Sequence, residues 1–155
     1  MKKVLIALDY SDATPVVVKK GVELAQALNA DITLIHVLSD ATYYSSLNYS
    51  PIFGFDSFSS LDIVQTNTVD SLREAAQEFL NRIKADIHAE NADTIIGEGD
   101  FADEILKAAT AMKADIIIMG THSRKGIDKI LMGSVAQKVL HKSEIPVLII
   151  PIRKH

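Results

Sequence analysis

The sequence contains no cysteine among its 155 residues. This absence excludes disulfide bonds, thiolate metal sites and thiol nucleophiles, and with them the extracellular disulfide scaffolds. Long apolar runs are lacking too. The first run, at 4–8, ends at Asp9 and is too short for the apolar region of a signal peptide. No run approaches the roughly 20 apolar residues of a membrane span. We therefore expect a soluble cytoplasmic protein without a membrane partner.

An excess of positive charge is also missing. The 16 Lys and Arg residues stand against 20 Asp and Glu residues, which gives a net charge of −4. No global positive field favours nucleic acid, although Arg124, Lys125 and Lys129 form a local basic cluster. With 48% apolar and 23% charged residues, the composition is that of one globular domain. We expect a single domain over residues 1–155.

Short apolar runs alternate with segments of helical period along the chain. The runs predict strands at 4–8, 32–38, 92–97, 115–119 and 146–152, and the periodic segments predict helices at 14–28, 69–87, 100–112 and 134–142. This alternation is typical of an α/β fold, an open and mostly parallel five-stranded sheet with helices on both faces. Such sheets bind ligands at the carboxyl ends of their strands, where the strand order reverses. The loops after the first and fourth strands are the candidates.

Local signals mark the helix starts and buried faces. Thr14-Pro15 suits the first turn of a helix, and Asp100 followed by Asp103 resembles a capping arrangement. The predicted buried faces comprise, helix by helix, Val17, Gly21, Leu24 and Leu28; Leu72, Ala76, Phe79, Ile83 and Ile87; Phe101, Ile105, Ala108 and Met112; and Val135 and Val139.

A long loop at about 39–62 has neither helical nor strand period. It holds six of the nine aromatic residues of the chain: Tyr43, Tyr44, Tyr49, Phe53, Phe55 and Phe58. Loops of this length act as lids, form binding surfaces or are flexible insertions. We favour a variable loop pinned by a few buried rings, with a lid or an interface as the alternative.

The segment after the fourth predicted strand carries the strongest chemical signal. Gly120 and Gly133 bracket it, so the backbone can approach a ligand closely, and Gly133-Ser134 opens a helix. The free N–H groups and positive dipole end of such a helix suit a phosphate. The segment is neither a Walker A loop nor a G-x-G-x-x-G fingerprint. It predicts an anion cradle of another type.

On these residues the chain resembles the universal stress protein family. Nucleotide-binding members carry G-2x-G-9x-G-[ST] between the fourth strand and the last helix, a spacing matched by Gly120, Ser123, Gly133 and Ser134. Asp9 after the first strand, Val37 near the end of the second, Gly-Glu-Gly-Asp at 97–100 and Pro-Val-Leu-Ile-Ile at 146–150 extend the resemblance along the chain. It implies a Rossmann-like fold of the universal stress protein type.

The resemblance implies a site for ATP with Mg²⁺, the metal being held mainly by phosphate oxygens and water. Ala7 and Asp9 would lie beside the adenosine, and Val37 would meet adenine through its backbone. The implied phosphate contacts are Gly120, Ser123, Gly133 and Ser134, with Met119, His122, Arg124 and Val135 nearby.

Several of these residues have a structural alternative. Ser123 replaces the second motif glycine, so its side chain either crowds the phosphates or donates its hydroxyl to them. Asp9 could cap a turn with Ser11 and Asp12 instead of binding ribose. His122 and Arg124, like its neighbour Lys125, could simply be solvated. His36, inside an apolar run, is interpreted as a hydrogen-bonded core or rim residue and not as a metal ligand.

These features predict an ATP-binding, dimeric stress-response module, which the resemblance implies would pair through the strand at 147–150. A nucleotide-free dimer is the first alternative, favoured by Ser123. A slow ATPase is the second, although the adenylyl-transfer signatures H-I-G-H and S-G-G-x-D-S and the G-x-S-x-G elbow are missing. We therefore assign no catalytic residue, and at most weak hydrolysis is expected.

Overall fold

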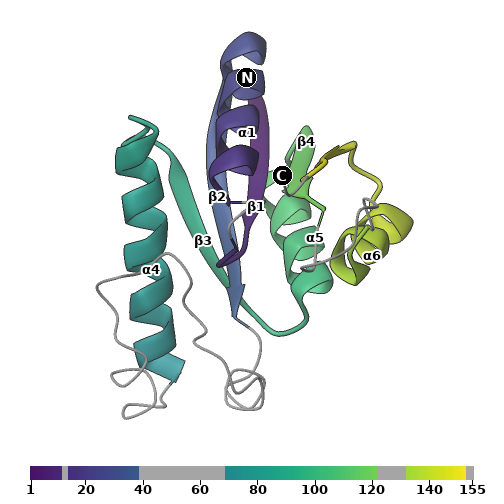
Figure 1. Ribbon diagram of the computed structural model, residues 1–155. Helices are drawn as coiled ribbons and strands as arrows, with labels where there is room; N and C mark the ends of the chain where they lie inside the picture. The colour runs from purple at the N-terminus through teal and green to yellow at the C-terminus, as the bar shows by residue number, and fades with distance from the viewer. Residues whose placement is uncertain (12–13, 39–68, 122–131, 153–155) are drawn as a thin grey trace.

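The computed structural model describes residues 1–11, 14–38, 69–121 and 132–152. Within these residues, strands and helices alternate along the chain (Figure 1). The strands are β1 (Lys2–Leu8), β2 (Ala30–Leu38), β3 (Asp93–Glu98), β4 (Ile116–Gly120) and β5 (Val147–Ile150). The helices are α1 (Thr14–Leu28), α4 (Val69–Asp86), α5 (Phe101–Met112) and α6 (Ser134–Lys142). The aromatic loop at 39–62 lies outside the described residues.

The five strands form one sheet in the order β3-β2-β1-β4-β5, and every neighbouring pair is parallel. The order therefore reverses between β1 and β4, where Ile6 lies opposite Ile118. On its other side β1 pairs with β2, so that Leu8 lies opposite His36. The predicted α/β fold is confirmed, and the sheet is parallel throughout its described strands.

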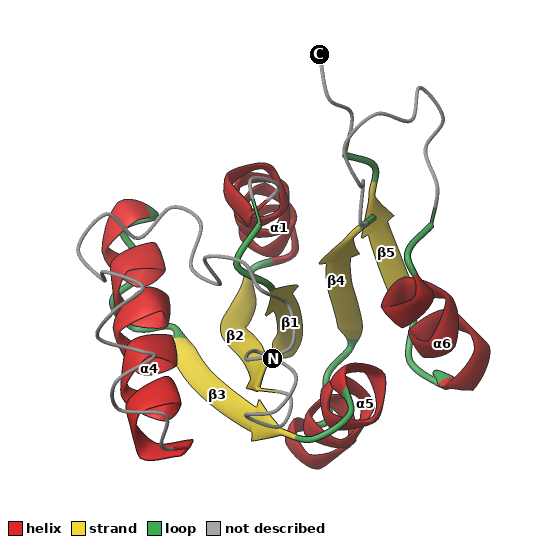
Figure 2. Cartoon of the chain, turned by 60° about the horizontal axis from the view of Figure 1, so that its bottom comes forward, coloured by secondary structure: helices red, strands yellow, loops and turns green. Residues whose placement is uncertain are grey.

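Helices cover both faces of the sheet, α1 and α4 on one and α5 and α6 on the other (Figure 2). Alternate residues of each strand supply the two buried layers, as the period-2 geometry of a strand requires. We call the first layer the α1/α4 cluster, which includes Val4, Ile6, Leu8, Val17, Leu34, Phe79, Leu80 and Ile118. The second is the α5/α6 cluster, which includes Leu5, Ile35, Val37, Ile105, Ile117, Met119 and Val139.

The predicted helix faces are correct at their centres and wrong at their margins. Val17, Phe79 and Ile105 are buried as expected. The prediction missed side chains that the structure buries fully or nearly so: Val18, Ala25, Ala75, Leu80, Ala102 and Ala109. Most of these are small, because alanines let a helix pack closely on a sheet and widen the buried arc beyond the large apolar residues.

The start of α5 confirms the predicted cap. The carboxylate of Asp100 accepts a hydrogen bond from the backbone N–H of Asp103 at 3.0 Å. The same carboxylate accepts a hydrogen bond from Lys138 Nζ of α6 at 2.8 Å, and Lys142 pairs with Asp103 at 3.2 Å. The Lys138 hydrogen bond, aided by the Asp103 N–H, holds the pKa of Asp100 below its ordinary value. Asp100 thus caps the start of α5 and links this helix to α6 through the hydrogen bond from Lys138.

Replacing Asp100 with alanine should lower the free energy of unfolding by about 1 kcal/mol at neutral pH, the usual cost of losing a helix cap. Asp100→Asn keeps the cap and should cost less. Because the pKa of Asp100 is lowered by folding, its contribution is complete above the ordinary carboxyl range and disappears as the pH falls through the folded value. Urea unfolding at several pH values measures this, and an equal cost of both variants would contradict it.

Candidate functional site

The predicted site lies at the carboxyl edge of the sheet, where β1 and β4 end side by side. Asp9 directly follows β1 and is exposed, whereas Thr121 directly follows β4 and is buried. Thr121 joins β4 to the segment after β5, since its Oγ1 accepts from the N–H of Ile152 at 2.9 Å. This edge is the point of strand-order reversal, where open α/β sheets bind ligands.

Four predicted site residues meet on the α5/α6 face of the sheet. Val37 and Met119 belong to the α5/α6 cluster, and Ala7 and Val135 pack against it. Val37 and Met119 are only 4% and 6% exposed. Their side chains therefore belong to the core, in keeping with the backbone contact that the family resemblance implies for Val37.

Asp9 lies in a hydrogen-bonded turn between β1 and α1. Its carboxylate accepts a hydrogen bond from Ser11 Oγ, and its carbonyl accepts one from Thr14 Oγ1 at 2.6 Å. The Thr14 N–H also donates to the carbonyl of Ser11 at 3.1 Å. The turn-capping interpretation of Asp9 is thus supported for Ser11, while Asp12 lies outside the described residues. Ribose binding by Asp9 stays a prediction.

The packing of the fold requires a glycine at position 120, which the sequence did not reveal. A Cβ atom at this position would lie 2.7 Å from Cγ2 of Val17, closer than real side chains approach. The end of β4 therefore packs against α1 without room for a side chain. The packing of α1 alone is enough to require this glycine, whether or not a phosphate also approaches it.

The start of α6 offers backbone donors without a side-chain cap. Gly133 is the N-cap residue, with φ −65° and ψ 158°, and no side-chain hydrogen bond caps the helix. The first N–H groups of a helix have no acceptor within it, and they lie at its positive end. Ser134, the first residue of α6, is exposed. These donors have the chemistry that a phosphate requires.

Three predicted ligands, His122, Ser123 and Arg124, fall outside the described residues, as do Lys125 and Lys129. Of the other predicted residues, the structure brings together Ala7, Val37, Met119 and Val135. Gly120 ends β4, and Gly133 and Ser134 begin α6. The central part of the anion cradle thus stays a prediction from the sequence.

His36 is a buried polar residue beside this edge. Its Nδ1 lies 2.9 Å from the carbonyl oxygen of Leu8, and the residue is 3% exposed. Burial lowers the pKa of His36, against the smaller opposing effects of the Leu8 carbonyl and the Asp9 charge. The interpretation of His36 as a hydrogen-bonded core residue is confirmed. Its position next to Val37 and opposite Leu8 could not be seen before the strands were paired.

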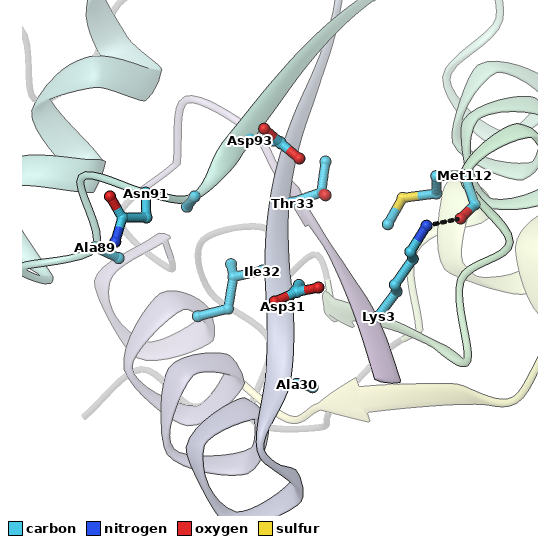
Figure 3. Close-up of a pocket in the computed structure, with 10 residues that line it drawn as sticks. Lys3, Ala30, Asp31, Ile32, Thr33, Ala89, Asn91, Asp93 and Met112 are labelled. Atoms are coloured by element: carbon cyan, nitrogen blue, oxygen red, sulfur yellow. Dashed lines mark hydrogen bonds between the residues drawn. The ribbon is translucent and has the colours of Figure 1, made fainter. Parts of the chain in front are cut away.

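A shallow pocket of about 450 Å³ lies at the opposite, amino edge of the sheet (Figure 3). Lys3, Asp31 and Asp93 stand at the starts of three adjacent strands around it, and Lys3 Nζ donates to the Met112 carbonyl at 3.2 Å. No motif of the sequence falls here, and the pocket is open, unlike the enclosed apolar sites typical of small ligands. It is separated from the predicted site by the length of the strands.

The described residues show neither a metal-binding cluster nor a membrane-spanning helix. Among these residues, no group of three or more His, Asp or Glu side chains is placed to hold a metal ion. None of the described helices is long and apolar enough to cross a membrane.

Residues 1–151 match the Universal stress protein family, so the chain belongs to this family. The universal stress protein MJ0531 of Methanocaldococcus jannaschii is 31% identical over 151 residues, which cover 96% of this chain and 81% of that protein. Among solved structures, the hypothetical protein MJ0577 superposes with a TM-score of 0.71 at 27% identity, covering 99% of this chain and 98% of its own.

Relatives of this fold have been solved with nucleotides. One universal stress protein is in complex with cAMP, at a TM-score of 0.58 and 24% identity, covering 96% of this chain and 95% of its own. The universal stress protein of Archaeoglobus fulgidus is in complex with dAMP. It superposes with a TM-score of 0.62 at 20% identity, covering 96% of this chain and 97% of its own. At such identities the likeness establishes the shared fold. Family members thus bind adenine nucleotides.

Proposed function

We propose that this protein binds ATP at the carboxyl edge of its sheet. The phosphates would lie on the N–H groups at the start of α6, and the adenosine would lie between Asp9 and the backbone of Val37. The observation that carries the proposal is the start of α6, where the N-cap is a glycine without a side-chain cap hydrogen bond and the first N–H groups have no acceptor within the helix. The cAMP and dAMP complexes of relatives support a nucleotide of this class.

The residues present fit a nucleotide better than a resident metal. The donors at the start of α6 are neutral N–H groups, and a bound Mg²⁺ would neutralise phosphate charge while keeping mainly phosphate and water ligands. The carboxylate of Asp9 accepts a hydrogen bond from Ser11 and its carbonyl accepts one from Thr14, and the carboxylate would accept another from a ribose hydroxyl.

The proposed role is regulatory. ATP would bind preferentially to one arrangement of the segment at 120–134, and this difference in affinity would change what a dimer presents to other proteins. The dimer would form through β5, which lies at the edge of the described sheet with the apolar sequence Val-Leu-Ile-Ile.

Isothermal titration calorimetry with ATP and Mg²⁺ tests the binding directly. We expect saturable binding with one nucleotide per chain. The absence of detectable heat and of retention in equilibrium dialysis at millimolar ATP would overturn the proposal. A steady-state phosphate-release assay distinguishes a binding module from the alternative of a slow ATPase, which would turn over more than once.

Ser123→Gly separates ATP binding from the alternative of a nucleotide-free dimer. Serine at a position that favours glycine costs about 1–2 kcal/mol and crowds the phosphate, so the glycine variant should bind ATP roughly 5- to 30-fold more tightly. Ser123→Ala is the matched control, because it removes the hydroxyl and keeps the Cβ. Weaker binding by both variants would instead show that the hydroxyl donates to the ligand.

A further inference from the structure

His36 holds the end of β1 in place. Its Nδ1 is 2.9 Å from the carbonyl oxygen of Leu8, the last residue of β1. A carbonyl can only accept, so Nδ1 carries the proton and the neutral ring leaves a lone pair on Nε2. The residue that follows Leu8 is Asp9, the proposed ribose ligand. The imidazole thus fixes the backbone directly before that carboxylate.

The same imidazole also contacts the residue directly after Asp9. The ring of Tyr10 lies with its centroid 4.2 Å from that of His36, and 4.9 Å from the ring of Phe79 on α4. The Phe79 ring in turn meets His36 edge-on at 5.7 Å. Both neighbours of Asp9 are therefore held by one side chain of β2, which is itself enclosed by α4.

The second nitrogen of this ring, His36 Nε2, is buried and has no hydrogen-bond partner among the residues that the structure describes. Burial lowers the pKa of the imidazole. Tyr10 and Asp9 are the titratable neighbours from the β1 end, and Asp9 opposes the effect of burial. On α4, the charges beside Phe79 are Glu78 and Arg82, which are exposed and pair with each other at 3.7 Å.

We propose that His36 is a positioning residue of the nucleotide site: its neutral ring holds Leu8 and Tyr10, and so Asp9, in the binding geometry. A second proton would go onto the buried Nε2, so the charged ring would leave the core to hydrate this N–H group and would thereby release Leu8 and Tyr10. This inference rests on the proposed ATP site. Acid would therefore weaken nucleotide binding through a residue that lies in the core and touches no ligand. By linkage, bound nucleotide would also resist protonation of this ring.

The direction of the pH effect follows from the burial of the ring. The folded protein holds His36 neutral below the pH at which a free histidine, near 6.5, becomes charged. Between these two values the unfolded state binds more protons than the folded state, so the stability falls as the pH decreases. The contribution of His36 to the ATP affinity should be constant at neutral pH and should decrease in acid, by at most about tenfold per pH unit for one proton.

Two substitutions separate positioning from simple packing. His36→Asn keeps an amide N–H near the position of Nδ1 and cannot titrate, whereas His36→Leu keeps an apolar core side chain and removes the donor. At pH 7.5 we expect His36→Asn to bind ATP within about threefold of wild type and His36→Leu to bind about tenfold more weakly, as for the loss of one buried hydrogen bond.

The pH profile from 7.5 down to the lowest pH at which both proteins stay folded is the decisive measurement. The affinity of wild type relative to His36→Asn should fall in acid, since the ligand and the rest of the chain are the same in both proteins and their contributions cancel in the ratio. His88→Asn is the matched control: His88 is exposed at φ 52°, a conformation that asparagine tolerates. It should follow wild type at every pH.

The outcomes that overturn the inference differ from those that overturn ATP binding. A wild-type protein that binds no ATP removes both proposals. A wild-type protein that binds ATP, with a pH profile shared by His36→Asn, removes only the role of His36. If His36→Leu does not fold, the comparison of wild type with His36→Asn decides alone. Titration of the His36 ring by NMR, with and without ATP, should show a lower pKa in the complex.

Discussion

Replacing Gly133 with aspartate should stabilise the protein slightly and nearly abolish ATP binding. Gly133 has φ −65° and ψ 158°, a conformation open to any residue, and aspartate is a better helix cap than glycine by a few tenths of a kcal/mol. The new carboxylate would occupy the N–H groups proposed for the phosphates and would repel them. At about 4 Å and an effective dielectric constant near 20 this repulsion is ~4 kcal/mol, so the affinity should fall by more than about 100-fold.

The opposite signs of the two effects make this experiment informative. Urea unfolding measures the stability, and calorimetry measures the ATP affinity of the same samples. Gly133→Ser is the matched control, because serine caps the helix without a charge and should reduce the affinity less. If the Gly133→Asp variant binds ATP as tightly as wild type, the phosphates do not lie at the start of α6.

Ile149→Pro should convert the proposed dimer into a monomer while leaving the fold intact. The N–H of Ile117 donates to the carbonyl of Pro146, and the N–H of Thr121 donates to that of Ile150. Backbone groups alternate in direction along a strand, so Ile149 between them presents its N–H to the free edge. Proline there removes an edge donor without breaking the ladder to β4, a position that strands tolerate. The dissociation constant of a dimer paired through β5 should rise at least about 100-fold.

Native mass spectrometry and light scattering measure the oligomeric state over a range of concentrations. Ile149→Ala is the matched control, since it removes the same half-buried side chain but keeps the N–H. A dimer that persists in Ile149→Pro would place the contact elsewhere on the molecule. Loss of the dimer in both variants would instead attribute pairing to the apolar side chain.

The sequence predicted the fold well because its signals are local and repeated. Each strand is a short apolar run, and the cap at Asp100 has the spacing that the structure shows. The margins of the helix faces could not be predicted in the same way. Leu80 is fully buried, although it lies next to the predicted stripe through Phe79. Its burial depends on how far α4 is rotated against β2 and β3, which no local pattern determines.

The sequence predicted where the candidate site lies on the sheet, but not which residues contact one another there. Strand order places Ala7, Val37 and Met119 at one edge, as the fold class requires. The close packing of Gly120 against Val17 and the bond from His36 to Leu8 depend on segments 28 to about 100 residues apart. Such contacts arise only once α1 lies across β4 and β2 lies beside β1. They explain why a motif glycine and a core histidine have roles that spacing alone does not reveal.

The shallow pocket at the amino edge has a practical use for these measurements. Asn91 lies exposed in its wall, at the end of the sheet opposite the nucleotide site (Figure 3). Because the chain contains no cysteine, Asn91→Cys would provide a single thiol for attaching a fluorescent label. The dye would stand a full strand length from Asp9, at the carboxyl edge of the sheet. Nucleotide binding and self-association could thus both be followed at nanomolar concentrations, far below those that calorimetry requires.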